Sequence, residues 1–444
     1  MDTKTEARPS PVAATPKQGG DIRARWAWVE PSVWTDGMLA ALENGVKGGK
    51  WFSLVDKVWS ERNLRAGFAK VKANRGAAGV DGVGVTRMEG ELDAEIARLS
   101  AALKDGTYEP RAVKRAWVPK PGSKEKRPLG VPTVRDRTVQ TALRNVLEPI
   151  FERKFSENSY GFRPGRGCKD ALREVDRLLR AGNVWVVDAD LKSYFDRIPH
   201  DRLLAEVGKE VADGRALDLI RKFLKQNVLD GLEEWTSEEG SPQGAVISPL
   251  LANIYLDPLD HMMEAAGRDM IRYADDFVVL CRTKEEAEAA LESVRVWTAA
   301  AGLPLPPEKT RIVDAAVEDF EFLGYRFSKG RKWPRKKSLD KLKDGVRELT
   351  RRANGKSLDE IIAKLNRKLA GWFGYFKHSY KTTFPSLDGW IRRRLRSILR
   401  KRSGCRGVCR NGNDNQRWPN AFFAIHGLFS LTDAHAEAVQ SRRS

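Results

Sequence analysis

The feature that most constrains this chain is a set of short apolar stretches that are followed by acidic residues. Residues 184–191 (VWVVDADL) form one such stretch, and residues 271–281 (IRYADDFVVLC) form two β-prone runs separated by Ala-Asp-Asp. These patterns predict a buried strand and a β-hairpin. We therefore expect Asp190 at the end of the strand, and Asp275 with Asp276 at the tip of the hairpin. If the strands lie side by side, the three carboxylates form one cluster.

Helical periodicity surrounds these strands. Apolar residues recur at helical intervals in residues 52–72 and 92–106, before the first strand. Two further helical stretches, at residues 202–227 and 284–301, follow the strands. The combination predicts an α+β fold in which helices back an antiparallel sheet.

The net charge of +19 lies entirely in the last quarter of the chain. Residues 331–444 contain 28 Lys and Arg and 9 Asp and Glu, whereas residues 1–330 contain 51 of each kind. A neutral body with a basic end suits a protein that holds a polyanion, and nucleic acid is the first candidate. A basic surface without such a partner is the alternative. No apolar stretch approaches the roughly 20 residues that span a bilayer, so we expect no membrane partner.

Three helix-like segments follow Arg331, at residues 338–353, 357–378 and 387–402. The last segment has an apolar stripe, and basic residues cover much of its remaining surface. A solvated surface helix is the alternative interpretation, but arginines placed so densely would repel one another without an anionic partner. The candidate nucleic-acid-binding residues are Arg392, Arg393, Arg394, Arg396, Arg400 and Lys401.

The beginning of the chain and its cysteines suggest a cytoplasmic protein. Residues 1–22 have almost no large apolar side chains, which predicts a flexible tail. Four cysteines are too few for a disulfide framework in so long a chain, and no signal-peptide segment is visible. Cys405 and Cys409 could form a zinc site with His426 and His435, although the spacing is irregular.

Seven blocks of the sequence resemble a known family, and they occur in that family's order. The blocks are RPLGVPTVRDRTVQTAL (127–143), SYGFRPGRGCKDAL (159–172), DADLKSYFDRIPH (188–200), GSPQGAVISPLLANIYLDPLD (240–260), RYADDFVVL (272–280), GLPLPPEKT (302–310) and FEFLGYRF (320–327). Together they resemble the group II intron reverse transcriptases, also called maturases. The resemblance covers about residues 50–430.

The resemblance implies a right-hand polymerase fold. Residues 23–330 would form the fingers and palm, and residues 331–444 would form a basic, all-helical thumb or X domain with a short C-terminal extension. Many members of the family end in a DNA endonuclease domain with paired cysteines and catalytic histidines. This chain resembles the compact subgroup that lacks it. The resemblance implies a bacterial, cytoplasmic location. When bound to DNA, the protein would associate with the nucleoid.

The family activity is RNA-directed DNA polymerisation with two Mg²⁺ ions. Such ions lie roughly 3.5 to 4 Å apart and stabilise the entering and leaving oxygens of the phosphoryl transfer. The resemblance implies that Asp190 and Asp275 hold both ions and that Asp276 supports the site. The backbone carbonyl of Leu191 would complete one coordination sphere. Taken alone, an Asp-Asp turn is more often a solvated loop.

Further positions match residues that the family places around the incoming nucleotide. Phe195 would lie under the sugar and exclude a 2′-hydroxyl by its bulk, which selects deoxynucleotides; a core aromatic is the alternative. Lys120 and Arg127 would bind the triphosphate, and a solvated loop is the alternative. Gln243 would contact the nucleotide. Lys309 would lie near the primer and nucleotide, unless it is an ordinary charged surface residue.

The implied partners are the parent group II intron RNA, an RNA template with a DNA primer, dNTPs and target DNA. The basic helices would bind the intron RNA and assist its splicing and mobility. A reverse transcriptase domesticated for host defence or repair is one alternative. An RNA-binding splicing factor without polymerase activity is another, but the intact carboxylates, Phe195 and the SPQG motif argue against it.

Overall fold

The computed structural model describes residues 22–441, except Lys47, 120–125, 192–193, Ser237, 308–309, Asn354 and 406–411. Lys120, Lys309 and Cys409 therefore lie outside the described residues, as do residues 1–21 of the expected N-terminal tail.

A four-stranded sheet, which we call the palm sheet, lies at the centre of the functional region. Its order is β6-β7-β3-β8, and every neighbouring pair is antiparallel. The strands are β3 (Trp185–Asp190), β6 (Asp269–Tyr273), β7 (Asp276–Cys281) and β8 (Arg311–Asp314). The predicted strand and hairpin are both confirmed.

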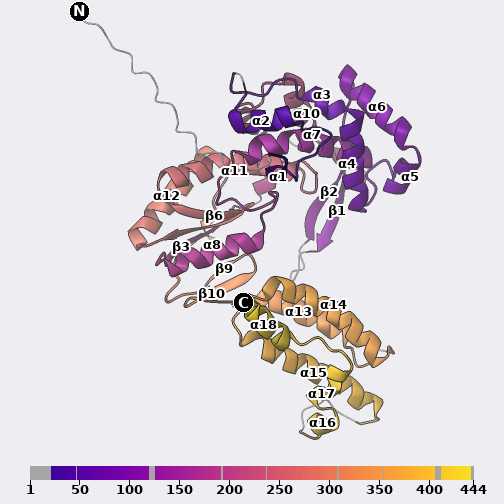
Figure 1. Cartoon of the computed structure of the whole chain (residues 1–444), viewed down its shortest axis with the longest axis vertical. Coiled ribbons are helices and arrows are strands. Elements are labelled where there is room, and N and C mark those ends of the chain that lie inside the picture. Colours follow the sequence, from indigo (N-terminus) through magenta and orange to yellow (C-terminus); the bar gives the residue numbers. More distant parts are fainter. Residues whose placement is uncertain are drawn as a thin grey trace, which may run out of the picture.

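Helices cover both faces of the palm sheet (Figure 1). Side chains alternate between the faces of a strand, so Val186 packs with α8 (Cys168–Arg180) on one face. Val187 points to the opposite face, which is covered by α11 (Ser248–Ala265) and α12 (Lys284–Ala300). This arrangement is the predicted antiparallel sheet backed by helices.

A second sheet, the fingers sheet, has the order β2-β1-β4-β5, with β1 and β4 parallel. Its strands are β1 (Val113–Pro119), β2 (Lys126–Val131), β4 (Val228–Asp230) and β5 (Glu233–Trp235). The helices of this part are α1 (Ile22–Arg25), α2 (Asp36–Asn44), α3 (Val55–Trp59), α4 (Glu61–Ala73), α5 (Val85–Gly90), α6 (Leu92–Asp105) and α7 (Val134–Glu152).

The helical stretch expected at residues 202–227 is two helices, α9 (His200–Val207) and α10 (Gly214–Leu224). Asp213 explains the break, because its carboxylate accepts hydrogen bonds from the backbone N–H groups of Arg215 and Ala216 at the start of α10. The same carboxylate accepts from the N–H groups of Leu54 and Val55. A local N-cap at Asp213 therefore sets the start of α10, and the same carboxylate also ties this helix to the start of α3.

A three-stranded sheet, the small sheet, connects the palm to the C-terminal helices. It consists of β9 (Phe320–Phe322), β10 (Tyr325–Ser328) and β11 (Arg331–Pro334). Leu323 and Gly324, which join β9 to β10, both have positive φ, at 45° and 82°. Because β11 continues to Pro334, the proposed division of the chain at residue 330 falls within this sheet and stays a prediction.

The expected all-helical region, residues 331–444, begins with the strand β11; after Pro334 its described regular elements are all helices (Figure 1). The helices are α13 (Lys336–Leu349), α14 (Leu358–Phe376), α15 (Thr383–Arg402), α16 (Gly412–Arg417), α17 (Asn420–Ile425) and α18 (Leu431–Gln440). Phe373 and Phe376 are buried and belong to the protein's own hydrophobic cores. Tyr325 of β10 donates its hydroxyl to the carbonyl of Tyr375, and this bond ties α14 to the small sheet.

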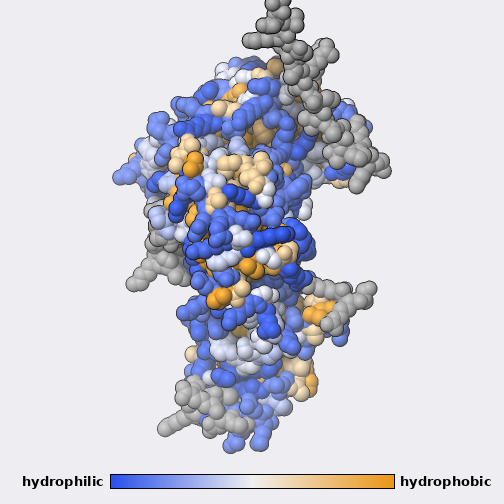
Figure 2. All heavy atoms as spheres, turned by 90° about the vertical axis from the view of Figure 1, so that its left-hand side faces the viewer, coloured by the Kyte–Doolittle hydropathy of each residue, from blue (hydrophilic) through white to orange (hydrophobic). Residues whose placement is uncertain are grey.

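In the described part of the chain, no helix combines the length and apolar character that crossing a bilayer would require. The face shown in Figure 2 is largely hydrophilic, with apolar residues in small, separate patches.

Candidate active site

The register of the palm sheet brings the predicted acids together. In the antiparallel pair of β3 and β7, Asp190 lies opposite Asp276. Side chains of directly opposite residues lie on the same face of a sheet, with Cβ atoms roughly 4.5 to 5.5 Å apart. Asp275 lies in the two-residue turn that joins β6 to β7. Three residues separated by up to 86 positions therefore meet at one end of the sheet.

A fourth acid shares this face. Asp188 lies two positions before Asp190 in β3, so both side chains point the same way. Its carboxylate is bound by Arg311 of β8, at 3.0 and 3.1 Å from two guanidinium nitrogens. Asp188 was not among the predicted site residues. The alternation of acids in DAD was the available signal, but the pairing with Arg311 appears only in the folded sheet.

The electrostatics of the cluster are those of crowded like charges. The pKa of Asp276 is raised to about 7. Burial is the largest cause, and repulsion from Asp188, Asp190 and Asp275 adds to it. Arg335 opposes this shift. The site therefore holds more negative charge than its own side chains can neutralise.

This donor set fits a hard divalent cation. Mg²⁺ prefers oxygen ligands and is usually held by one or two carboxylates together with substrate phosphates and water. Among the described residues, no group of three or more His, Cys, Asp or Glu side chains forms a preformed metal site. Paired carboxylates at a sheet end, to be completed by substrate oxygens and water, match this preference. The roles of Asp190, Asp275, Asp276 and the Leu191 carbonyl as ligands remain predictions.

A buried clasp holds the turn that carries Asp275. Arg272 is fully buried, and its Nε donates to both carboxylate oxygens of Asp260, at 2.8 and 3.0 Å. Its Nη1 donates to Asn253 Oδ1 and to the carbonyl of Ala274, each at 3.0 Å. Ala274 has φ +60°, a conformation that L residues rarely adopt. The guanidinium thus fixes the strained residue next to Asp275.

The segment SYGFRP supplies the other side of the clasp. Asn253 donates to the carbonyl of Gly161 at 2.8 Å. A Cβ at Gly161 would lie 2.3 Å from the backbone nitrogen of Ala274 and 2.9 Å from the carbonyl carbon of Tyr273. Only glycine permits this approach. The structure therefore explains a motif to which the sequence analysis gave no role.

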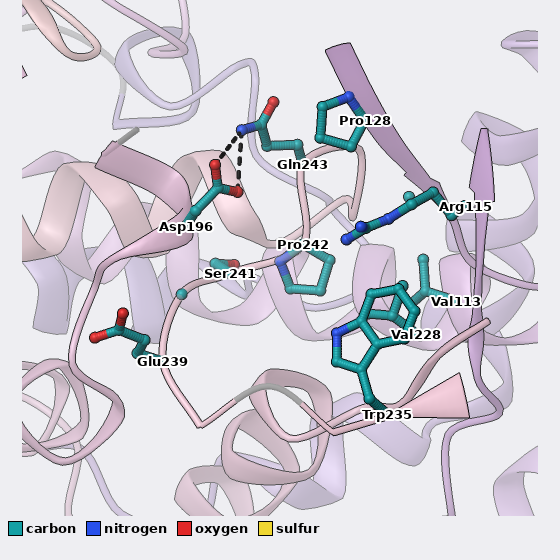
Figure 3. Close-up of a pocket in the computed structure, with 12 residues that line it drawn as sticks. Val113, Arg115, Pro128, Asp196, Val228, Trp235, Glu239, Ser241, Pro242 and Gln243 are labelled. Atoms are coloured by element: carbon teal, nitrogen blue, oxygen red, sulfur yellow. Dashed lines mark hydrogen bonds between the residues drawn. The ribbon is translucent and has the colours of Figure 1, made fainter. Parts of the chain in front are cut away.

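Phe195 and Gln243 lie on adjoining segments beside the acids. Phe195 belongs to the short 3₁₀ turn η1 (Tyr194–Asp196) and is half-buried. Its carbonyl accepts a hydrogen bond from the N–H of Ser241 at 2.6 Å. Gln243, two residues further, donates from Nε2 to both carboxylate oxygens of Asp196 at 3.1 Å (Figure 3). The fold thus brings these two candidate nucleotide-binding residues onto paired segments.

A pocket of about 300 Å³ lies between this region and the fingers sheet. Arg115 of β1 projects into it, with its guanidinium 4.7 Å from the ring centre of Trp235 (Figure 3). Asp196 and Gln243 line the same pocket. Arg127 is exposed near the start of β2, opposite Val118 in the β1–β2 pair.

A second cavity, of about 540 Å³, adjoins the acidic cluster. Its wall includes Asp276, Gly324 of the β9–β10 turn and Arg335. Lys341 of α13 and Lys368 of α14 line the opposite part. Asp276 thus faces a space that is also lined by cations of the C-terminal helices.

Three of the six candidate cations of α15 already bind protein groups. Arg396 is buried and donates to the carbonyl of Trp418 at 2.8 Å. Arg400 pairs with Asp414 at 3.0 Å, and Arg394 donates to the carbonyl of Thr350 at 3.0 Å. These side chains hold α15 to its neighbours, and this role explains why arginines occur at these three positions. Nucleic-acid binding by Arg392, Arg393 and Lys401 stays a prediction.

The histidines considered for a zinc site have other contacts. His426 Nδ1 lies 2.8 Å from a carboxylate oxygen of Asp359. The His435 ring stacks on Phe384, with 4.5 Å between the ring centres. Cys405 is partly exposed.

Comparison with known proteins agrees with this geometry. Residues 118–327 match the family described as reverse transcriptase (RNA-dependent DNA polymerase), and residues 339–418 match the group II intron maturase-specific domain. The chain is 36% identical over 292 residues to Protein YkfC of Escherichia coli K12, covering 57% of this chain and 76% of YkfC.

It is also 39% identical over 193 residues to the group II intron-encoded protein LtrA of Lactococcus lactis, covering 44% of this chain. The match spans only 32% of LtrA. Among solved structures, a chain of the partial Cas6-RT-Cas1–Cas2 complex has 24% identity and a TM-score of 0.37, over 56% of this chain and 42% of that one. The family matches and the extent of the YkfC alignment show that this chain belongs to the family of group II intron-encoded reverse transcriptases and maturases.

Proposed function

We propose that this chain is an RNA-directed DNA polymerase encoded by a group II intron, which copies RNA into DNA by two-metal nucleotidyl transfer. The observation that carries the proposal is the cross-strand pairing of Asp190 with Asp276, with Asp275 in the adjoining turn. Burial raises the pKa of Asp276 to about 7, and repulsion from the neighbouring acids adds to it; bound cations would favour its ionised form. The family membership supports the same reaction.

The chain's own side chains would hold the reactants. Asp190 and Asp275 would bind the cations, and the Arg272 clasp would fix Asp275 before substrate arrives. Bound Mg²⁺ supplies Lewis-acid stabilisation of the attacking and leaving oxygens. Phe195 would exclude a 2′-hydroxyl from the sugar site, while Arg127 and Lys120 would bind the triphosphate.

The test is extension of a DNA primer on an RNA template by Asp275→Asn. We expect the rate to fall at least about 10³-fold, because two ions share this ligand, while binding of the primer–template duplex stays near normal. Asp218→Asn is the control, since this exposed carboxylate lies on α10 and is not part of the acidic cluster. Equal activity of Asp275→Asn and wild type would contradict the proposal.

We further propose that the C-terminal helices bind the parent intron RNA and assist its splicing and mobility. The match of residues 339–418 to the maturase-specific domain supports this role, as does the basic charge of the region. Splicing chemistry would belong to the RNA, and the protein would serve as a scaffold. Asp275→Asn should therefore still promote splicing of the intron RNA at low Mg²⁺, where the RNA alone is slow. Loss of splicing together with polymerisation would contradict separate sites.

A further inference from the structure

We propose that Tyr375 of α14 is a positioning residue for nucleotidyl transfer, because its hydroxyl holds the backbone turn that lines the cavity beside Asp276. The inference rests on the proposed polymerase function, which places the reacting groups at the acids. It gives a helix of the C-terminal region a part in the geometry of the polymerase site, separate from any contact with RNA.

The turn in question, Leu323–Gly324, joins β9 to β10 and has an unfavourable backbone conformation. Leu323 has φ +45° and Gly324 has φ +82°. Glycine adopts such angles freely, but they are unfavourable for an L residue such as leucine. Both residues line the 540 Å³ cavity together with Asp276. A change in the conformation of this turn would therefore alter the wall of the cavity next to the acid.

The two carbonyl groups of the turn are bound from different parts of the chain. The carbonyl of Gly324 accepts from the N–H of Arg335 at 2.9 Å and from the hydroxyl of Ser338 at 3.3 Å. The carbonyl of Leu323 accepts from the hydroxyl of Tyr375 at 2.7 Å, across 52 residues of chain. The bond that holds the strained residue thus comes from α14.

A second tyrosine crosses the same interface in the opposite direction. Tyr325 of β10 donates its hydroxyl to the carbonyl of Tyr375, also at 2.7 Å. Both bonds attach α14 to the small sheet, but only the bond from Tyr375 ends on the turn. Loss of the Tyr325 hydroxyl would weaken the attachment of α14 and leave the carbonyl of Leu323 bound. The two tyrosines therefore separate attachment of the helix from positioning of the turn.

The experiment compares wild type, Tyr375→Phe and Tyr325→Phe. We measure the single-turnover rate of incorporation of one dNTP into a DNA primer on an RNA template, the affinity for that duplex, and thermal unfolding. Loss of a neutral hydrogen bond of roughly 0.5 to 1.5 kcal/mol corresponds to about 2- to 13-fold. Tyr375→Phe should lower the incorporation rate by this factor and leave duplex affinity unchanged. Tyr325→Phe should keep the wild-type rate.

A substitution in the turn provides a test by rescue. Asparagine tolerates the left-handed conformation better than leucine does, so Leu323→Asn should hold the turn without help from the tyrosine. Removing the Tyr375 hydroxyl in the Leu323→Asn background should then slow incorporation less than it does in wild type. The Tyr375 hydroxyl also interacts with the thiol of Cys168. Cys168→Ala removes that interaction alone and should keep the wild-type rate.

Three results would overturn the inference. Equal loss of rate in Tyr375→Phe and Tyr325→Phe would show that both tyrosines only attach the helix. Weaker duplex binding at an unchanged rate would show that Tyr375 does not act on the reacting geometry. A loss in Cys168→Ala as large as that in Tyr375→Phe would assign the effect to the thiol. Failure of the proposed polymerase function would look different, since wild type would then incorporate no nucleotide.

Discussion

Replacing Gly161 with alanine tests whether the clasp positions the catalytic turn. The added Cβ would lie 2.3 Å from the nitrogen and 3.1 Å from the Cα of Ala274. Normal contacts at these atoms are about 3.4 Å, so the turn must retreat by roughly 1 Å. Asp275 directly follows Ala274 and would move with it.

The expected loss follows from that displacement. A misplacement of about 1 Å in a catalytic geometry lowers the rate by about 10²-fold. Overpacking of a buried site destabilises the fold by about 1 to 3 kcal/mol. This is less than the 5 to 15 kcal/mol by which domains are typically stable, so the variant should remain folded.

The assay is single-turnover primer extension on an RNA template, together with thermal unfolding. Gly214→Ala is the matched control, because a Cβ there meets no atom within 4 Å. It should keep the wild-type rate. If Gly161→Ala extends primers as fast as wild type while remaining folded, the clasp does not position Asp275, and the reasoning is refuted.

Three further variants test other parts of the structure. Phe195→Ala should lower the preference for dNTPs over rNTPs by at least about 10-fold in competition assays, because space for a 2′-hydroxyl opens; an unchanged ratio would exclude the steric gate. Burial raises the pKa of Asp257 to about 6, so its ionisation opposes folding as pH rises above its unfolded value of 3.8. Asp257→Asn should therefore increase the unfolding free energy by about 3 kcal/mol at pH 8 and by almost nothing below about pH 3, as denaturant titrations would show. Replacing Arg393 and Lys401 with Glu should lower the slope of log RNA affinity against log salt concentration by the equivalent of about two phosphate contacts. Arg396→Ala should instead reduce the stability of the fold and leave that slope unchanged.

Much of the fold could be predicted because its signals are local. The apolar runs at 184–191 and 271–281 became β3 and the β6–β7 hairpin. The helical periodicity of residues 284–301 correctly predicted α12. Thr283 and Glu286 form a capping box at its start. The break between α9 and α10 was missed although Asp213 offered a local signal, since its side chain caps the start of α10.

The candidate site also combines features that the sequence predicted with features that it could not predict. The sequence by itself determined which acids, aromatic residue and glutamine are present, and the order in which they occur. It could not determine that Arg396 is buried, since a stripe of arginines looks alike whether its members face solvent or a neighbouring helix.

Tertiary structure alone decided the distances. Strand register places Asp190 opposite Asp276, and close backbone approaches at Gly161 and Gly244 fix the loops around them. Asp196 meets Gln243 across 47 residues of chain. Side-chain type is a property of each position, but convergence depends on long-range packing and hydrogen bonds, which exist only once the chain has folded.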